Sequence, residues 1–359
     1  MTSLFRQTWL AIVIGATAAG AVGCAGSGGS TGNAGTAGSA SVAQINGMGA
    51  TFPYPIYSKW FEEYGKAHPS VRINYQSQGS GAGIRGLTNK TVFFGASDQP
   101  MKEEALKAAP GPILHFPTVL GAVVPVYNIA GVTQELNFTG PVLADIVLGK
   151  IKKWNDPALT KLNPGAALPN ADITFVHRSE GSGTTFVWTD YLSKVSPEFK
   201  QAVGADASVK WPVGVGAKGN EGVTGMVKQS PNSIGYIELV YALQNKVAFG
   251  AVQNAGGNFV KASVESVTAA AAGAAATMPE DFRVSITHAP GADAYPIASF
   301  TWILLYENPD DKAQSRAMVD FMKWALVDGQ TFAKDLGYAP LPQAVVDAEL
   351  KALARVKTQ

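Results

Sequence analysis

The stretch Arg178-Ser179-Glu180-Gly181-Ser182-Gly183-Thr184-Thr185-Phe186 places an arginine before a loop of small residues, and that loop before an apolar, helix-like run. The first N–H groups of a helix lack intrahelical partners and carry partial positive charge. Glycines let an oxyanion approach these groups, and hydroxyls with an arginine complete a ring of donors. The stretch therefore predicts an anion-binding helix start, although a single motif of this kind is more often a plain helix cap.

Three further segments carry the same chemistry. They are Gly47–Pro53 with the hydroxyl of Thr51, Gly79–Gly83 with Ser80, and Gly95–Asp98. Each taken alone fits an ordinary turn or helix cap. Because ligands in α/β sheets bind beyond the carboxyl ends of strands, where helices begin, the joint presence of four such segments predicts that they meet at one anion.

Short β-like runs alternate with helix-like runs along the rest of the chain, which predicts an α/β fold. Strands are expected at 71–75, 93–97, 119–128, 173–176, 233–236 and 300–306, and helices at 56–64, 184–195 and 317–326. The Ala/Gly-rich segment 267–277 has no clear period and fits either a weak helix or a surface loop.

Two segments match the glycine pattern of dinucleotide-binding proteins by their letters, Gly81–Gly86 and Gly214–Gly219. The first is expected between a strand and a helix. Neither is followed, at about 20 residues, by a convincing acidic residue at a strand end. Either interpretation of the first match makes it an anion-binding helix start.

The N-terminus has the features of an export signal over residues 1–23, with Arg6 before a short apolar stretch. The signal ends at Ala21-Val22-Gly23-Cys24, which resembles a bacterial lipobox and implies lipidation of Cys24; an ordinary signal peptide is the alternative. Residues 24–42 are almost entirely Gly, Ser, Ala, Thr and Asn, so they are expected to form a flexible tether.

Composition excludes several classes of function. Removal of the signal takes away one positive charge, Arg6, so the formal net charge falls from +1 to 0, which argues against nucleic acid as a partner. Cys24 is the only cysteine, so neither an intramolecular disulfide nor a multi-cysteine metal site is expected. No later segment has 18 continuous apolar residues, so no transmembrane helix is expected.

An enzyme is the main rival class of function. A hydrolase elbow needs Gly-x-Ser-x-Gly, and these letters occur only at Gly28–Gly32, inside the expected tether. The four histidines, His68, His115, His177 and His288, form no triad or metal-ligand pattern and are expected to be structural.

Several motifs in order resemble the phosphate-binding proteins of Pst-type ABC phosphate importers. They are Gly49–Pro53, Asn74–Gln76, Phe94–Asp98, Leu148–Trp154, Gly181–Thr184, Lys210–Pro212 and Ile234–Tyr236. The resemblance runs from about residue 46 to about residue 350. It implies an α/β, two-lobed periplasmic-binding-protein fold, type II-like, that closes about a hinge on a ligand in the interlobe cleft. Lobe I would comprise 43–125 and 295–359, and lobe II 126–294.

The resemblance also implies a set of ligand residues. Thr51, Phe52 through its backbone N–H, and Ser80 match donor positions, and Asp98 matches the acceptor. Arg178, Ser182, Gly183 and Thr184 match the donors of the second lobe. Glu180 stands where the family has an aspartate beside the arginine, and Phe93 stands where the family has an acidic residue.

The implied function is high-affinity binding of inorganic phosphate and its delivery to the permease and ATPase of an ABC importer, without enzymatic activity, cofactor or metal. The protein would be exported and held at the outer face of the cell membrane by lipid on Cys24. The alternatives are a binding protein for sulfate, molybdate or tungstate, and a surface-interaction protein with the same fold. Asp98 favours phosphate, because a carboxylate accepts a hydrogen bond from a protonated anion and rejects an unprotonated one.

Overall fold

The computed structural model describes residues 43–274 and 278–359. The predicted export signal at 1–23, Cys24 and the predicted tether at 24–42 lie outside these residues. Within the described ranges, no helix is both long enough and apolar enough to cross a lipid bilayer.

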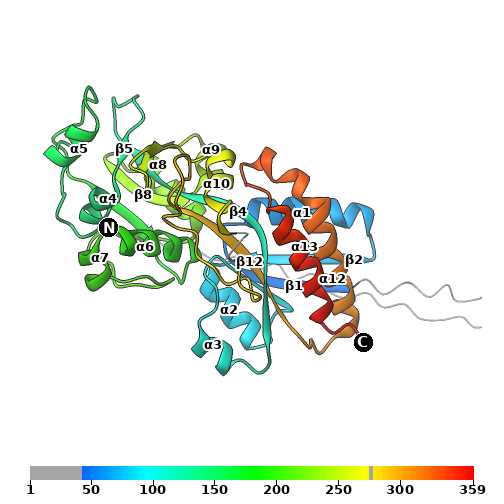
Figure 1. Ribbon diagram of the computed structural model, residues 1–359. Coiled ribbons are helices and arrows are strands. Elements are labelled where there is room, and N and C mark those ends of the chain that lie inside the picture. Colours follow the sequence, from blue (N-terminus) through cyan, green and yellow to red (C-terminus); the bar gives the residue numbers. More distant parts are fainter. Residues whose placement is uncertain (1–42, 275–277) are drawn as a thin grey trace, which may run out of the picture. The chain divides into compact units, whose positions relative to one another are not determined.

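A nine-stranded sheet runs through the described part of the chain in the order β2-β1-β3-β12-β4-β8-β6-β7, with β9 also paired to β4 (Figure 1). Its strands are β1 (Ala43–Gly49), β2 (Val71–Ser77), β3 (Phe94–Ser97), β4 (Ile113–Asn128), β6 (Thr174–Arg178), β7 (Val215–Ala217), β8 (Ser233–Glu238), β9 (Ala248–Phe249) and β12 (Ala298–Tyr306). A smaller sheet joins β5 (Asn137–Phe138), β10 (Ala251–Gln253) and β11 (Phe259–Val260) in the order β11-β10-β5.

The long strand β4 divides the large sheet into two halves. It pairs antiparallel with β12 from Ile113 to Ala122, and antiparallel with β8 from Val123 to Asn128. We call β2, β1, β3 and β12 the first sheet half, and β8, β6 and β7 the second sheet half. Within the first half β1, β2 and β3 are parallel, and within the second half β6, β7 and β8 are parallel.

Helices follow the strands in both halves (Figure 1). Those that follow strands of the first half are α1 (Tyr54–Ala67), α2 (Ser80–Thr88), α3 (Glu103–Ala108), α12 (Lys312–Val327) and α13 (Gln343–Ala352). The segment between β4 and β12 contains α4 (Gly140–Val147), α5 (Pro157–Leu162), α6 (Gly183–Val195), α7 (Pro197–Ala202), α8 (Gly219–Gln229), α9 (Leu239–Asn245) and α10 (Val264–Ala271). Short 3-10 turns span Gly329–Phe332, Lys334–Leu336 and Leu353–Arg355.

The alternation predicted from the sequence is confirmed, with differences at the element ends. The helix expected at 317–326 begins at Lys312, because the carboxylate of Asp311 accepts hydrogen bonds from the N–H groups of Ala313 and Gln314, both at 2.9 Å. For the Ala/Gly-rich segment 267–277 the sequence fits either a weak helix or a surface loop. Its residues as far as Ala271 belong to α10, which begins after a capping box at Ser263.

The expectation that Gly81–Gly86 lies between a strand and a helix is wrong. The whole motif lies inside α2, which begins at Ser80. Its glycines let α2 pack closely on the sheet: a Cβ at Gly83 would lie 2.6 Å from the carbonyl oxygen of Ala96 and 2.7 Å from the Cα of Gly49. The pattern reflects helix–sheet packing, while the predicted helix start remains at Ser80.

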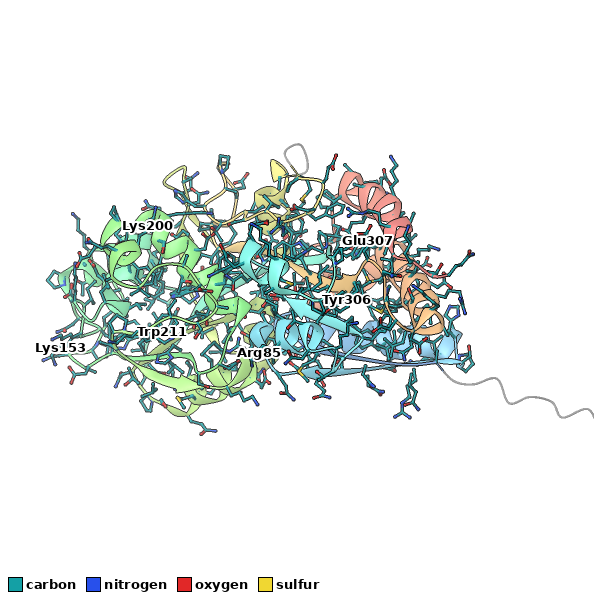
Figure 2. All side chains as sticks on the ribbon, turned by 90° about the horizontal axis from the view of Figure 1, so that it is seen from below. Arg85, Lys153, Lys200, Trp211, Tyr306 and Glu307 are labelled. Carbon is teal, nitrogen blue, oxygen red and sulfur yellow. The ribbon has the colours of Figure 1, made fainter. Side chains whose placement is uncertain are left out.

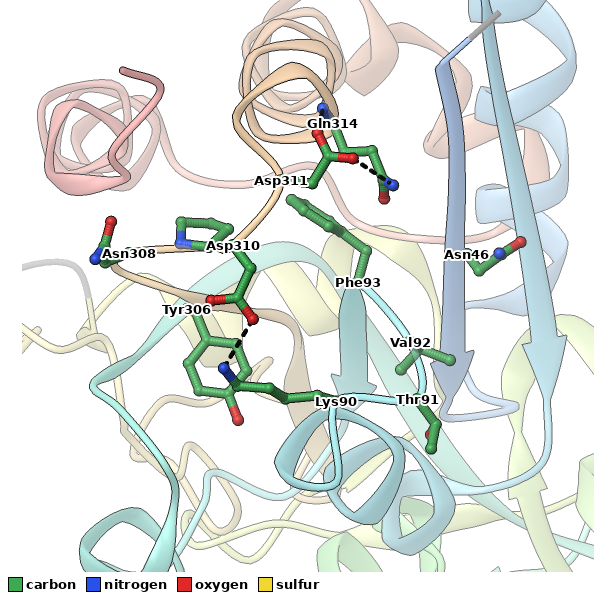
Figure 3. A pocket seen from close by; sticks show the side chains of 11 residues that line it. Asn46, Lys90, Thr91, Val92, Phe93, Tyr306, Asn308, Asp310, Asp311 and Gln314 are labelled. Carbon is green, nitrogen blue, oxygen red and sulfur yellow. Dashed lines mark hydrogen bonds and ion pairs between the residues drawn. The ribbon is translucent and has the colours of Figure 1, made fainter.

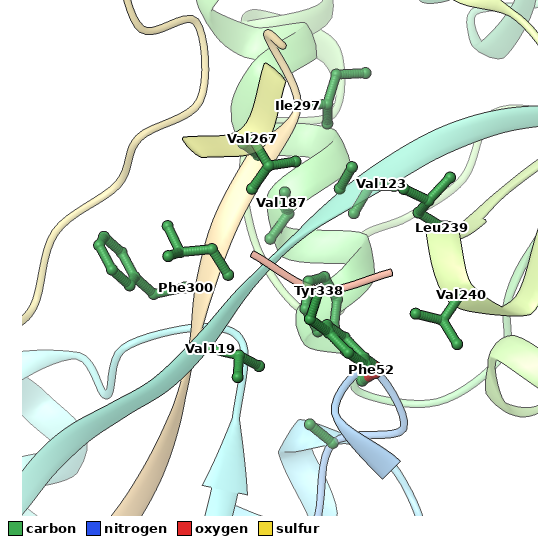
Figure 4. Packing of buried hydrophobic residues seen from close by; sticks show 14 of the residues in the cluster. Phe52, Val119, Val123, Val187, Leu239, Val240, Val267, Ile297, Phe300 and Tyr338 are labelled. Carbon is green, nitrogen blue, oxygen red and sulfur yellow. The ribbon is translucent and has the colours of Figure 1, made fainter. Parts of the chain in front are cut away.

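The hydrophobic core continues beneath both halves of the sheet (Figure 4). Val119 and Val123 of β4 are fully buried on either side of the partner switch. Phe52 packs in this core against Tyr338, with ring centroids 6.4 Å apart, and the Tyr338 hydroxyl donates to the Phe52 carbonyl at 2.6 Å. The C-terminal part of the chain therefore holds the loop after β1 in place.

Gly49 provides a test of how tightly β1 and β3 are joined at their carboxyl ends. Its φ is +152°, and a Cβ there would lie 2.1 Å from the carbonyl oxygen of Ala96. We expect Gly49→Ala to lower the free energy of unfolding by about 1–3 kcal/mol, because the strands must move apart. Urea unfolding measures this change.

The matched control is Gly65→Ala. Gly65 lies in α1, and nothing lies within 4 Å of the Cβ that it would gain. This substitution is expected to stabilise the protein by up to about 1 kcal/mol, because alanine has the higher helix propensity. Equal effects of the two substitutions would contradict the close-packing argument.

Candidate anion-binding site

The topology brings the carboxyl ends of two sets of parallel strands together. In the first half, β1, β2 and β3 end just before Thr51, Ser80 and Asp98. In the second half, β6, β7 and β8 end at Arg178, Ala217 and Glu238. The two edges meet where β4 changes partner, since Val123 pairs with Glu238. Residues far apart in the sequence thereby reach one place.

Direct hydrogen bonds join the two sets. The N–H of Gly183 donates to the Ser80 hydroxyl at 2.9 Å, and the N–H of Gly81 donates to the Gly181 carbonyl at 2.9 Å. A Cβ at Gly183 would lie 2.5 Å from the Ser80 hydroxyl oxygen and from the Asp98 carboxylate. The glycines of the Arg178–Phe186 stretch therefore allow the loops to approach each other, as well as giving access to backbone N–H groups.

Four helices begin at this junction. They are α1 after Thr51 to Pro53, α2 at Ser80, α6 at Gly183 and α8 at Gly219. The unpaired N–H groups and the dipoles of helix starts favour negative charge. Four starts brought together give the site a positive potential before any charged side chain is counted.

Arg178 is the cationic side chain of the cluster, and it is 3 % exposed. Its Nε donates to Glu180 Oε1 at 2.8 Å, its Nη2 donates to the same oxygen, and its Nη1 donates to the Thr184 hydroxyl at 3.2 Å. Glu180 Oε1 also accepts from the N–H of Gly219 at 3.1 Å. The glutamate that departs from the family pattern thus binds the arginine and the start of α8.

Asp98 is the carboxylate that faces these donors, and it is 1 % exposed. Burial raises its pKa from 3.8 to about 7, although the hydroxyl of Thr301, the charge of Arg178 and the hydroxyl of Ser80 act against the rise. Thr301 donates to Asp98 Oδ1 at 2.8 Å. The raised pKa means that this carboxyl takes up or releases a proton near neutral pH.

All of the predicted ligand residues are buried: Thr51, Phe52, Ser80, Asp98, Arg178, Ser182, Gly183 and Thr184. Hydrogen bonds join most of them, directly or through Asn220, while Phe52 and Ser182 reach the cluster as chain neighbours of Thr51 and Gly183. Two of them are also held by local structure. The Ser182 hydroxyl oxygen caps α6 by accepting from the N–H of Thr185 at 3.1 Å, and the Phe52 ring lies in the core.

Sequence reasoning missed three buried residues of the cluster, Asn220, Glu238 and Thr301. Asn220 Nδ2 donates to Thr51 at 2.8 Å and to Thr184 at 3.3 Å. Its position just after a strand and a glycine is the signal that marks the other segments, but Gly219 also ends the dinucleotide-like pattern at Gly214–Gly219, which hides that signal. Glu238 and Thr301 reach the cluster through strand pairing, which leaves no mark in the sequence.

Two of the four histidines, His115 and His177, pack or bond away from the hydroxyls of the cluster. His115 Nε2 accepts from the N–H of Met101 at 3.0 Å, and burial lowers the pKa of His115 to about 3. His177 is the residue before the last of β6 and stacks on Trp211, with ring centroids 5.0 Å apart; Figure 2 labels Trp211. The described ranges contain no group of three His, Cys, Asp or Glu residues able to hold a metal ion.

A separate cavity of about 270 Å³ lies near the start of β3 (Figure 3). Phe93 lines it, together with Lys90, whose ammonium group pairs with Asp310 at 2.8 Å. None of the predicted ligand residues lines this cavity. The Phe93 departure from the family pattern therefore concerns a surface feature outside the anion cluster.

Comparisons with known proteins agree with this geometry. A family model described as a PBP superfamily domain matches residues 34–328. The phosphate-binding protein PstS of Pasteurella multocida is 48 % identical over 316 residues, covering 88 % of this chain and 90 % of the relative. The PstS protein of Xylella fastidiosa (strain Temecula1) is 50 % identical over 305 residues, covering 84 % of this chain and 83 % of the relative.

Solved structures show the same fold. A phosphate-binding protein from Stenotrophomonas maltophilia aligns with a TM-score of 0.66 and 19 % identity, covering 86 % of this chain and 93 % of that chain. An ABC-type phosphate transport receptor from Vibrio cholerae aligns with a TM-score of 0.54 and 18 % identity, covering 83 % of this chain and 100 % of that chain. The mixed α/β architecture predicted from the sequence is confirmed.

The pKa of Asp98 predicts how the stability of the anion-free protein depends on pH. Because this pKa is raised in the folded state, the contribution of Asp98 is fully present below pH 3.8 and is lost as the pH rises through about 7. We expect the free energy of unfolding of Asp98→Asn, relative to the parent protein, to increase between pH 4 and pH 7 by up to about 4 kcal/mol. Urea unfolding at several pH values measures it.

Asp206→Asn is the control for this experiment. Partial burial acts to raise the pKa of Asp206, but hydrogen bonds from Lys102 and Gln99 outweigh this effect, so the pKa of Asp206 lies below its ordinary value. Its stability contribution is therefore lost only at acid pH, and the Asp206→Asn difference should stay flat above about pH 5. A flat difference for Asp98→Asn as well would contradict the raised pKa.

Proposed function

This chain belongs to the PstS family of phosphate-binding proteins, within the PBP superfamily, and we propose that it binds inorganic phosphate where the two sheet halves meet. The observation that carries the proposal is the cluster itself, in which four helix starts, the buried cation of Arg178 and the buried carboxyl group of Asp98 come together. The ligand set comprises Thr51, Phe52, Ser80, Asp98, Arg178, Ser182, Gly183 and Thr184, with Glu180 supporting Arg178.

Asp98 gives the site its preference for phosphate. Near neutral pH phosphate carries at least one proton, and an ionised Asp98 accepts a hydrogen bond from it. Sulfate carries no proton, so an ionised Asp98 would oppose it with like charge in a buried site. A buried polar group left unpaired in this way rejects the wrong ligand by about 10⁴-fold or more.

We propose that phosphate closes two lobes about a hinge in β4. Lobe I comprises 43–125 and 295–359, and lobe II comprises 126–294. The partner switch of β4 between Ala122 and Val123 supports this division, because the strand leaves one half of the sheet there and enters the other. Hinge closure around a ligand is the usual motion of periplasmic binding proteins. The hydrogen bonds from Gly183 to Ser80 and from Gly81 to Gly181 would then belong to the closed form.

The closed protein would deliver phosphate to the permease and ATPase of an ABC importer. Members of the PstS family are binding proteins that serve transport, and this chain is a binding protein rather than an enzyme. Export by residues 1–23, lipid on Cys24 and a tether at 24–42 would keep the protein at the outer face of the membrane. Mass spectrometry of the mature N-terminus tests the lipid.

The proposal predicts a preference that depends on pH. Calorimetric titration of residues 43–359 with phosphate and with sulfate should show a strong preference for phosphate at pH 8. The preference should fall as the pH drops through about 7, because a protonated Asp98 can donate to sulfate. In Asp98→Asn the preference should be small at every pH, because the amide can donate to either anion. Unchanged discrimination in that variant would mean that Asp98 does not sense the proton.

Arg178 should contribute strongly to affinity. Arg178→Ala removes a buried cation and leaves Glu180 beside the anion, so phosphate binding should weaken by about 2–5 kcal/mol. Arg178→Lys keeps the charge but loses the forked geometry, so its phosphate affinity should lie between those of the parent protein and Arg178→Ala. Arg316→Ala is the control, because Arg316 is an exposed residue of α12 whose Nη1 donates to the Thr358 carbonyl. A loss below about 1 kcal/mol for Arg178→Ala would place Arg178 outside the site.

A further inference from the structure

The hydroxyl oxygens of Thr51 and Thr184 each accept two hydrogen bonds from nitrogen donors. Thr51 Oγ1 accepts from Asn220 Nδ2 at 2.8 Å and from the Asn220 backbone N–H at 3.2 Å. Thr184 Oγ1 accepts from Asn220 Nδ2 at 3.3 Å and from Arg178 Nη1 at 3.2 Å. A hydroxyl has two lone pairs and one hydrogen. Both lone pairs of each oxygen are therefore occupied, and only the hydrogen is left to interact with a ligand.

We propose that Asn220 is a positioning residue that fixes the hydrogen-bond polarity of the site, so that Thr51 and Thr184 can only donate to the bound anion. This inference rests on the proposed phosphate-binding function and deepens it. Asn220 contacts both hydroxyls with one amide group, although Thr51 follows a strand of the first sheet half and Thr184 is the second residue of the helix after a strand of the second. It thereby ties the orientation of the Thr51 hydroxyl to the joining of the halves, while the Thr184 hydroxyl is oriented within the second half.

The amide of Asn220 has a fixed orientation. Asn220 is fully buried, and its Oδ1 accepts from the backbone N–H of Glu238 at 3.1 Å. Turning the amide over would set Nδ2 against that N–H and would remove the donor that the two threonines share. The backbone N–H at the end of β8 therefore determines that Nδ2 of the amide, and not Oδ1, points at the hydroxyls.

This polarity matters for selectivity because it leaves a carboxylate as the acceptor for a ligand proton. If the threonine lone pairs were free, a hydroxyl could rotate and accept the ligand hydrogen in place of the carboxylate. The Ser80 oxygen is occupied in the same way, by the N–H groups of Gly183 at 2.9 Å and Asp98 at 3.2 Å. The acceptors that remain in the cluster are then carboxylates: Asp98, together with Glu180 Oε2 and Glu238 Oε1, which have no hydrogen-bond partner among the described residues. A ligand proton therefore meets a carboxylate and not a hydroxyl oxygen.

The decisive variant is Asn220→Asp, which replaces the shared donor with an acceptor of the same shape. An ionised side chain there would take the hydrogens of Thr51 and Thr184 and would place a negative charge beside the ligand. We expect the Kd for phosphate at pH 8 to rise by ~100-fold or more, and the loss to shrink as the pH falls and the new carboxyl gains a proton. The charged and titratable groups around this position are Arg178, Glu180, Asp98, Glu221, Glu238 and Tyr241.

Asn220→Ala distinguishes an effect on the hydrogen-bond polarity of the threonine hydroxyls from the simple loss of the Asn220 contacts. It removes the donor without adding an acceptor, so the hydroxyls can rotate but are not captured. The Kd at pH 8 should rise by only ~10-fold. A merely structural role would make the two variants lose affinity equally, with parallel pH profiles, and that result would overturn the proposal.

The matched control is Asn163→Asp, because Asn163 is 1 % exposed and its Nδ2 donates to two carbonyls outside the cluster, those of Asn137 and Leu159. Phosphate affinity should stay at the parent value in this variant. Calorimetry with inorganic phosphate between pH 5.5 and pH 8.5 gives all the constants, and thermal unfolding without phosphate checks that each variant is folded.

Parent-like affinity of Asn220→Asp at pH 8 would overturn the inference while leaving the proposed function intact. If the parent protein itself bound no phosphate, the proposed function would fail and would take this inference with it. Should Asn220→Asp not fold, Asp98→Asn made in the Asn220→Ala protein decides the question. Freed threonine oxygens could then accept the ligand proton, so Asp98→Asn should cost less phosphate affinity there than in the parent protein, and an equal cost overturns the inference.

Discussion

The structure depends on one constraint: a carboxylate, Asp98, is buried among the groups that we propose to bind phosphate. Burying a charged group is costly unless hydrogen bonds and opposite charge compensate it. Here Thr301 donates to the carboxylate and Arg178 lies near enough to lower its pKa, yet burial still raises that pKa to about 7. Such a group is poised to exchange or share a proton with a ligand, which is how one carboxyl can separate two tetrahedral anions of similar size.

The sheet topology makes this cluster possible. Three parallel strands in each half end at a common edge, and the partner switch of β4 turns the two edges toward each other. Every loop that leaves these edges leads into a helix start, so backbone N–H groups accumulate at one place. The fold thereby provides much of the positive potential from the backbone, and a single arginine, partly balanced by Glu180, is enough to complete it.

The hydrogen bonds within the cluster determine which of its groups can donate to a ligand. Nitrogen donors occupy the oxygen lone pairs of Thr51, Ser80 and Thr184, so these hydroxyls have only hydrogens to offer. Thr51 and Ser80 accept from donors of the second half, so their polarity is completed only when the halves are joined, whereas Thr184 accepts from donors of its own half. In the proposed function, closure of the lobes would complete the recognition of phosphate, and Asn220 would link the two through its bonds to Thr51 and Thr184.

The sequence by itself determined the local pieces: the strand, glycine and helix order around Arg178, Ser80 and Asp98, the α/β alternation, and through its motifs the family. These follow from nearest-neighbour chemistry, in which glycines, caps and hydrophobic periodicity act over a few residues. It could not place Asn220, Glu238 or Thr301, because their roles come from strand pairing and from contacts as distant as that between Thr301 and Asp98, 203 positions apart. Only the tertiary structure decided that the glycines of 81–86 serve helix packing, and that one amide reaches both threonines. Burial and long-range register are properties of the whole chain, so no short stretch of it encodes them.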